Sequence, residues 1–248
     1  MDGYGPTSYG DRFADVYDEW YPELSEVEAT VSALVQLTGH GAVLELGVGT
    51  GRVAIPLAVA GAAAGLTVHG IDSSAAMLDV LRTKPGSDLV TTHVGDMVDD
   101  VPAGPFQLVF VAFNTIFNLA QPGRQAACFR AVAARLAPGG RFVVEAFVPD
   151  DPPREGAAIT VRSMTADRVV LSVSVHRPAD QVAEGQFVEL TDAGAVRLRP
   201  WSIRYASPTE LDAMATSAGL RLEERRSGFG GGSFRDGDDR HVSVYRRG

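Results

Sequence analysis

A glycine-rich turn is the feature of the sequence that most directly suggests chemistry. The apolar stretch 42–46, which contains Glu45, leads into the run GVGTGR at 47–52. Glycine lets the backbone turn sharply at the end of a strand and lets a ligand approach without meeting a Cβ atom. A dinucleotide fingerprint has glycine or alanine where this chain has Arg52, so the match to dinucleotide binding is imperfect. The turn predicts a nucleotide-like ligand, unless its glycines only serve a tight strand–helix connection.

Two acids follow the turn at the ends of the next predicted strands. Asp72 lies 21 residues after Gly51, where its carboxylate could accept both ribose hydroxyl protons. Asp96 stands in the sequence VGDM, where it could accept from an adenine amino group while Met97 covers the ring. Each acid alone would more often cap a helix. Because the carboxyl ends of parallel strands meet at one crevice, the set predicts a nucleoside site.

The elements that position these residues alternate between strand and helix up to about residue 150. Short apolar runs predict strands over 42–46, 66–72, 89–94, 106–113 and 141–148. Helical patterns lie between them, over 51–60, 74–84 and 124–136, and a first helix is expected to begin in a capping box at Ser25 and Glu28. This alternation is typical of parallel βαβ units in a doubly wound sheet.

The pattern changes after Asp150. Runs 158–163, 168–176, 186–190 and 195–205 read as antiparallel strands, and Ser207-Pro208-Thr209-Glu210 then predicts a helix start. No helix fits between the closing strands 220–227 and 241–246, so the last strand should be antiparallel. We therefore expect an α/β fold: a doubly wound, mostly parallel seven-stranded sheet with an antiparallel last strand, plus a small antiparallel β insert. The expected division is 1–151 with 207–248 as one domain and 152–206 as the insert.

Composition limits the class of protein. The 248 residues are 45% hydrophobic and carry 22 basic against 31 acidic side chains, a net charge of −9. An acidic chain is a poor binder of nucleic acid or of an anionic membrane. Cys128 is the single cysteine, which excludes a disulfide scaffold and a Cys-rich zinc site. Asp150 and Asp151 precede two prolines and read as loop acids, so no metal site is predicted. The N-terminus lacks the pattern of a signal peptide, which predicts a cytoplasmic protein.

These motifs together resemble those of class I S-adenosylmethionine-dependent methyltransferases. The resemblance is carried by LELGVGTGR, the acids of GIDSS and VGDM, RLAPGGRFVVE before the fifth strand, and the antiparallel last strand. It covers roughly residues 9–148 and 207–246. The tyrosine stretch FADVYDEWY at 13–21 and the antiparallel insert are also similar to small-molecule N-methyltransferases that act on nucleotide-linked aminosugars.

The resemblance implies S-adenosylmethionine as cofactor and assigns its contacts. Glu45, Gly47, Gly49 and Gly51 would serve the methionine half, Asp72 the ribose, and Asp96 with Met97 the adenine. The remaining expected cofactor contacts are Tyr17, Tyr21, Ser73, Met77 and Phe113. The implied reaction is methyl transfer to a nitrogen or oxygen of a small metabolite, in secondary-metabolite or aminosugar tailoring.

A second set of residues is expected on the acceptor side. His176 and Glu145 are the candidate general bases, although His176 could lie on an exposed strand face and Glu145 could be a satisfied acid at a strand end. The candidate acceptor-binding residues are Asn114, Phe117, Asn118, Trp201, Arg204 and Tyr205. For Trp201 and Tyr205 the alternative is packing of the insert against the sheet.

Two other functions remain open from the sequence. One is a nicotinamide-dependent oxidoreductase, against which Arg52 and the reversed last strand argue. The other is a protein that binds a nucleoside cofactor without transferring methyl. The expected partner is a small-molecule acceptor, not a membrane or nucleic acid, and a homodimer is left open.

Overall fold

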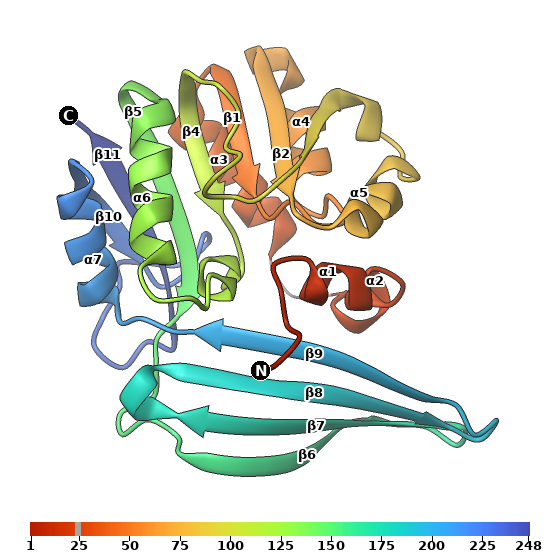
Figure 1. Ribbon diagram of the computed structural model, residues 1–248. Helices are drawn as coiled ribbons and strands as arrows, with labels where there is room; N and C mark the ends of the chain where they lie inside the picture. The colour runs from red at the N-terminus through yellow and green to blue at the C-terminus, as the bar shows by residue number, and fades with distance from the viewer. Residues whose placement is uncertain (23–25) are drawn as a thin grey trace.

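Two β-sheets organise the chain in the computed structural model, which describes residues 1–22 and 26–248 (Figure 1). The larger sheet has seven strands in the order β10-β11-β5-β4-β1-β2-β3. The strands β1 to β5 are parallel, whereas β11 is antiparallel to both β5 and β10. Their bounds are β1 Gly41–Leu46, β2 Leu66–Asp72, β3 Val90–Val94, β4 Phe106–Val111, β5 Leu136–Phe147, β10 Leu220–Arg226 and β11 Arg240–Arg247. The expected α/β fold and its antiparallel last strand are confirmed.

Helices cover both faces of this sheet, which is why its strands are apolar on both sides. In β4, Leu108 and Phe110 belong to the core shared with α3 (Val27–Thr38), α4 (Ala54–Gly61) and α5 (Ala75–Arg82). Val109 and Val111, on the opposite face, belong to the core shared with α6 (Arg124–Arg135) and α7 (Pro208–Ser217). The carboxyl ends of the parallel strands are thereby held at a single edge.

Short helical segments connect or precede these elements. Two helices, α1 (Ser8–Phe13) and α2 (Tyr17–Trp20), precede α3, and the 3-10 turns are η1 Ala62–Ala64, η2 Ser87–Leu89, η3 Thr115–Asn118 and η4 Pro178–Asp180. Within residues 1–22 and 26–248, no helix is both long enough and apolar enough to cross a membrane.

The second sheet is the expected antiparallel insert between β5 and α7. It has four strands in the order β6-β7-β8-β9, with bounds β6 Gly156–Met164, β7 Arg168–Arg177, β8 Val182–Thr191 and β9 Val196–Arg204. Helices α1 and α2 lie between the two sheets, as Figure 1 shows, and α1 contacts both β9 and α5. The division into a domain 1–151 with 207–248 and an insert 152–206 stays a prediction, because the N-terminal helices pack on both parts.

Several predicted boundaries were wrong. Strand β5 begins at Leu136 rather than at residue 141, directly after α6 ends at Arg135. Pro138-Gly139-Gly140 lies within the strand, where the pairing with β4 is irregular. Strand β8 begins at Val182, since the left-handed residue Gln181 makes the turn that precedes it. Strand β4 ends at Val111, because Phe113 and Asn114 adopt φ values of 47° and 64°.

The predicted helix starts differ in their outcome. Ser207 caps α7 as expected: its Oγ accepts a hydrogen bond from the Glu210 backbone N–H at 3.3 Å, and the Glu210 carboxylate accepts from the Ser207 N–H at 2.7 Å. The expected cap at Ser25 lies outside the described residues, and α3 begins at Val27. Helix α4 begins at Ala54, three residues later than expected from the end of the glycine turn.

Candidate functional site

A cavity of about 520 Å³ lies at the carboxyl ends of β1 and β2, a size common for small-molecule sites. The glycine turn, the ends of β2 and β3, the N-terminal segment and the η3–α6 connection line it. Many of the predicted site residues are part of this lining, namely Tyr17, Gly47, Gly49, Asp72, Ser73, Met77, Asp96, Met97 and Asn118. The structure thus brings most of the predicted cofactor set together at one place.

The three glycines of the turn have positive φ values, but their surroundings differ. A Cβ at Gly47 would lie 2.4 Å from Thr115 Cγ2, and one at Gly51 would lie 2.8 Å from Leu81 Cγ. A Cβ at Gly49 would meet nothing closer than the Gly47 carbonyl oxygen at 4.0 Å, so the space beside it is open. Gly49 therefore offers its backbone to a ligand, whereas Gly51 packs against α5 and does not line the cavity.

Asp72 fixes the turn to the end of β2. Its Oδ2 accepts a hydrogen bond from the Gly49 N–H at 2.8 Å and its Oδ1 accepts from the Ser74 N–H at 2.9 Å. Burial raises the pKa of Asp72, and these two backbone donors oppose that rise. A carboxylate has about four lone-pair sites, so Asp72 keeps acceptor capacity toward the cavity that it lines.

Glu45 lies behind the turn and does not line the cavity. Its side chain is 4% exposed, and its Oε2 finds no hydrogen-bond partner among the described residues. Burial raises the pKa of Glu45 to about 8, against the opposing charge of Arg52 and a hydrogen bond from the Ala54 backbone. A buried carboxyl group with an unsatisfied oxygen is costly unless a cation or donor arrives.

Asp96 lines the cavity, but one of its oxygens already has protein partners. Asp96 Oδ1 accepts from the Val98 N–H at 2.7 Å and from the Arg124 guanidinium at 2.5 Å. Arg124 also pairs with Asp99 at 2.8 Å, and both residues line the cavity. Sequence reasoning missed Arg124 and Asp99, because their pairing joins residues from separate elements and leaves no local signal.

The N-terminal segment forms one wall of the cavity through Tyr9 and Tyr17, and also through Tyr4, Gly5 and Pro6, which the sequence did not single out. Several polar contacts tie it to the residues around the glycine turn and the end of β2, among them Ser73 Oγ donating to the Pro6 carbonyl at 3.0 Å and Lys84 pairing with Asp18 at 2.7 Å. Asp11 accepts from Ser74 Oγ at 2.7 Å, and Asp18 accepts from Thr50 Oγ1 at 2.7 Å. The ring of Tyr21 lies tilted by 52° against that of Tyr17, with ring centroids 5.1 Å apart, but Tyr21 does not line the cavity.

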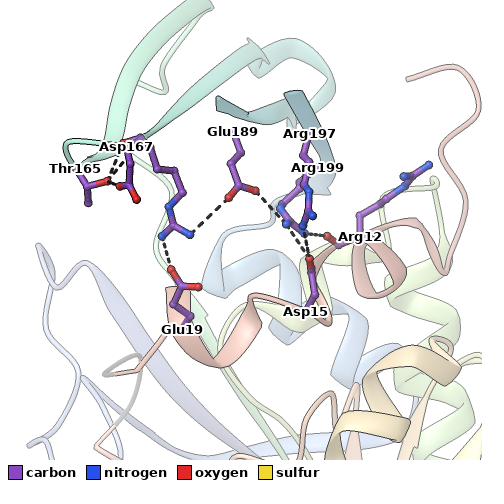
Figure 2. A network of polar contacts seen from close by, with 9 residues as sticks. Arg12, Asp15, Glu19, Thr165, Asp167, Glu189, Arg197 and Arg199 are labelled. Carbon is purple, nitrogen blue, oxygen red and sulfur yellow. Dashed lines mark hydrogen bonds and ion pairs between the residues drawn. The ribbon is translucent and has the colours of Figure 1, made fainter. Parts of the chain in front are cut away.

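The same segment is tied to the insert by a network of charged side chains (Figure 2). Arg199 of β9 is 3% exposed and pairs with Asp15 at 2.5 Å and with Glu189 of β8 at 3.2 Å. Arg199 also donates to the Arg12 carbonyl, and Arg168 of β7 pairs with Glu19. Hydrogen bonding from Arg199 lowers the pKa of Asp15, so this carboxylate is charged at neutral pH. The insert thereby holds α1 and α2 against the cavity.

The residues predicted for the acceptor side are dispersed. Glu145 is buried on β5 and accepts from the Phe113 N–H at 2.9 Å, and burial raises its pKa. His176 lines a separate cavity of about 190 Å³ together with Tyr205. Asn118 lines the large cavity, whereas Glu145, His176 and Tyr205 do not.

The other acceptor candidates have structural contacts. Asn114 Oδ1 accepts from the Phe147 N–H at 2.6 Å, and the buried ring of Phe117 lies 4.9 Å from that of Phe147. Trp201 packs near Phe187 with ring centroids 6.3 Å apart, and Arg204 donates to the Ala120 carbonyl at 2.9 Å. Phe113 lies under the Arg52 guanidinium, outside the cavity lining. In the described part of the chain, no three His, Cys, Asp or Glu side chains gather as metal ligands.

Comparisons with known proteins agree with this geometry. A model of the methyltransferase domain matches residues 43–140. The structure of the CcbJ methyltransferase from Streptomyces caelestis superposes with a TM-score of 0.89, at 38% identity, over 98% of this chain and 99% of that one. The sugar N-methyltransferase KedS8 from Streptoalloteichus sp shares the fold, with a TM-score of 0.69 at 22% identity over 100% and 99% of the two chains.

A curated relative matches over most of its length as well. The cypemycin N-terminal methyltransferase from a Streptomyces species is 30% identical over 226 residues, which are 88% of each chain. The likeness extends to the fold, to the glycine turn at the end of β1 and to the acid at the end of β2. It assigns the chain to the methyltransferases and not to the nicotinamide-dependent oxidoreductases. The chain is therefore an enzyme of the S-adenosylmethionine-dependent methyltransferase family, related to methyltransferases that tailor natural products.

Proposed function

We propose that this enzyme transfers the methyl group of S-adenosylmethionine to a nitrogen of a small metabolite, with an oxygen as the alternative acceptor atom. The observation that carries the proposal is the wall formed by Tyr4, Tyr9 and Tyr17 across the large cavity. This wall leaves room for the cofactor and a small acceptor, but not for a folded macromolecule. Nitrogen is favoured because the curated relative is, by its name, an N-terminal methyltransferase.

The residues around the cavity fit the chemistry of the cofactor. The open space beside Gly49 accommodates the methionine half next to the turn, with Gly47 on the same wall. Asp72 would accept hydrogen bonds from the ribose hydroxyls, next to Ser73, whose own hydroxyl donates to the Pro6 carbonyl at 3.0 Å. Asp96 with Met97 and Met77 would enclose the adenine. Glu45 lies behind the turn beside the charge of Arg52, outside the cavity lining, so it would act on the methionine half only through the position of the turn. Gly51, Tyr21 and Phe113 would act indirectly, by shaping these neighbours.

The enzyme's own contribution to the reaction is mainly alignment. S-Adenosylmethionine would supply an electrophilic methyl group on sulfur. An uncharged amine would bond to that methyl in line as its bond to sulfur breaks, so that S-adenosylhomocysteine leaves neutral and the methylated amine later loses its proton to water. Holding two reactants in that geometry can supply a large part of a rate enhancement. Glu145 is engaged by a backbone N–H, and His176 faces a different cavity, so neither is placed to take a proton from an acceptor in the large cavity. We assign acceptor positioning to Asn118 and to the neighbouring Gln121, which lines the same cavity.

Replacing Asp72 by alanine should weaken binding of S-adenosylhomocysteine by about tenfold to a hundredfold. The expected loss, about 1.5–3 kcal/mol, is that of hydrogen bonds to a charged group. Isothermal titration calorimetry measures it directly. The matched control is Asp79→Ala on α5, where the carboxylate is exposed and pairs with Arg82. Equal affinities for the wild type and Asp72→Ala would remove Asp72 from the cofactor site.

Replacing Gly49 by alanine tests whether the turn faces the ligand. Gly49 and Gly65 both have positive φ values, 54° and 72°, so alanine strains the backbone at either position. At Gly65 a Cβ meets nothing within 4 Å, and that residue does not line the cavity. We expect both variants to lose a similar unfolding free energy, about 1 kcal/mol, and only Gly49→Ala to lose cofactor affinity. If both variants bind equally well, the turn has only a structural role.

Alignment without a positioned base predicts small effects at the two candidate bases. We expect His176→Ala and Glu145→Gln to keep turnover within about tenfold of the wild type, because loss of a general base costs about 10²–10⁴ in rate. Steady-state kinetics with saturating cofactor give the comparison, and binding of S-adenosylhomocysteine controls for folding. A hundredfold fall in turnover with unchanged cofactor affinity would identify that residue as a base and contradict the alignment mechanism.

A further inference from the structure

The insert sheet has exposed aliphatic side chains on the face that is turned away from α1 and α2. The face toward α1 and α2 carries Ser172, Ser174, Glu189 and Arg199, of which the last three are buried. The opposite face, which we call the outer face, carries aliphatic side chains on all four strands, and toward one end it also carries Gln186 and the ion pair of Arg177 with Glu184. Strand register places on it Ile159, Val161, Met164, Val169, Leu171, Val173, Val175, Val188, Leu190, Val196 and Leu198.

The aliphatic side chains at the two edges of the outer face are largely exposed. The exposed fractions are 71% for Ile159, 62% for Val161 and 73% for Met164 on β6, and 63% for Val196 and 53% for Leu198 on β9. An antiparallel sheet with one solvated face normally alternates apolar-in and polar-out. Contiguous exposed apolar surface on a soluble protein marks a contact with another molecule. The outer face therefore needs a partner.

We propose that the partner is a second copy of this chain, with the two outer faces packed against each other around a twofold axis. Flat sheets pack face to face about 10 Å apart, with their side chains interdigitated. A twofold interface requires a patch that is complementary to itself, and the aliphatic part of the outer face meets that requirement.

The size of the outer face is adequate for a dimer. The partly exposed aliphatic side chains of the outer face present on the order of 500 Å² of apolar surface per copy, estimated from the apolar area that a side chain of this size removes from water when it is fully buried. A standard specific interface buries about 800 Å² per partner, including a polar rim. The aliphatic side chains would thus form the core of an interface of ordinary size.

Charge also favours a second copy over a membrane. The chain has a net charge of −9, so most approaches between copies, or toward an anionic bilayer, are repulsive. On the insert, Glu189 faces inward to Arg199, and Glu184 is paired with Arg177 at 2.9 Å and with the N-terminal amine at 3.0 Å. Two outer faces can therefore meet without bringing unpaired carboxylates together.

The mass in solution tests the proposal. Light scattering behind size-exclusion chromatography, at micromolar concentration, should give twice the 26.2 kDa of the chain. The double variant Val161→Lys with Leu198→Lys should halve that mass, because it buries like charges in the interface. The control pair, Val59→Lys with Val94→Lys, adds the same charge at side chains that are 57% and 60% exposed outside the insert, and should stay dimeric.

A cross-linking experiment does not depend on destabilising the dimer. Val188 lies on an interior strand of the insert sheet, and Cys128 is buried with its pKa raised by burial to about 12, so it should not react. We expect Val188→Cys to form a covalent dimer with a short bismaleimide, and the wild type to form none.

Three results would overturn the proposal. They are a monomeric wild type, a double lysine variant that stays dimeric, and a Val188→Cys protein that does not cross-link. A monomeric wild type that co-floats with phosphatidylcholine vesicles would assign the outer face to a membrane instead.

Discussion

The buried guanidinium of Arg199 is the constraint on which the arrangement of this enzyme depends. A charge that is removed from water must be paired, and Arg199 finds its partners on two different parts of the chain, Glu189 in the insert and Asp15 in the N-terminal segment. Meeting that requirement brings the insert against α1 and α2. These helices also hold to the larger sheet through Asp11 and Asp18, and so they form the wall of the cavity. The N-terminal wall of the large cavity is therefore held by ion pairs that lie outside the cavity.

Features with a local cause were predictable from the sequence. The glycine turn, the acid at the end of β2 and the capping box of α7 each depend on a few consecutive residues and on backbone geometry. The antiparallel last strand followed from the Gly- and Asp-rich composition of the loop before β11, which offers no helix for a parallel crossover.

Features with a long-range cause were not predictable. Arg124 reaches Asp96 from the start of α6, and Tyr4 lines the cavity only because the N-terminal segment lies across it. His176 and Glu145 have residue types that suit a base, but the strand register turns one toward a smaller cavity and engages the other with a backbone N–H. The buried charges on the inner face of the insert have the same origin, because Arg199 and Glu189 face inward, where Asp15 provides a second partner for Arg199. Periodicity alone would place them in solvent.

The account depends most on the claim that the insert holds the N-terminal wall over the cofactor. Calorimetric titration of S-adenosylhomocysteine into Asp15→Ala tests it, because Asp15 is exposed enough for the variant to fold while Arg199 keeps Glu189. Asp192→Ala, in the turn between β8 and β9, is the matched control. We predict that Asp15→Ala binds about tenfold more weakly, equivalent to ~1.4 kcal/mol, and that the control binds like the wild type. Equal affinity in all three proteins would contradict the claim.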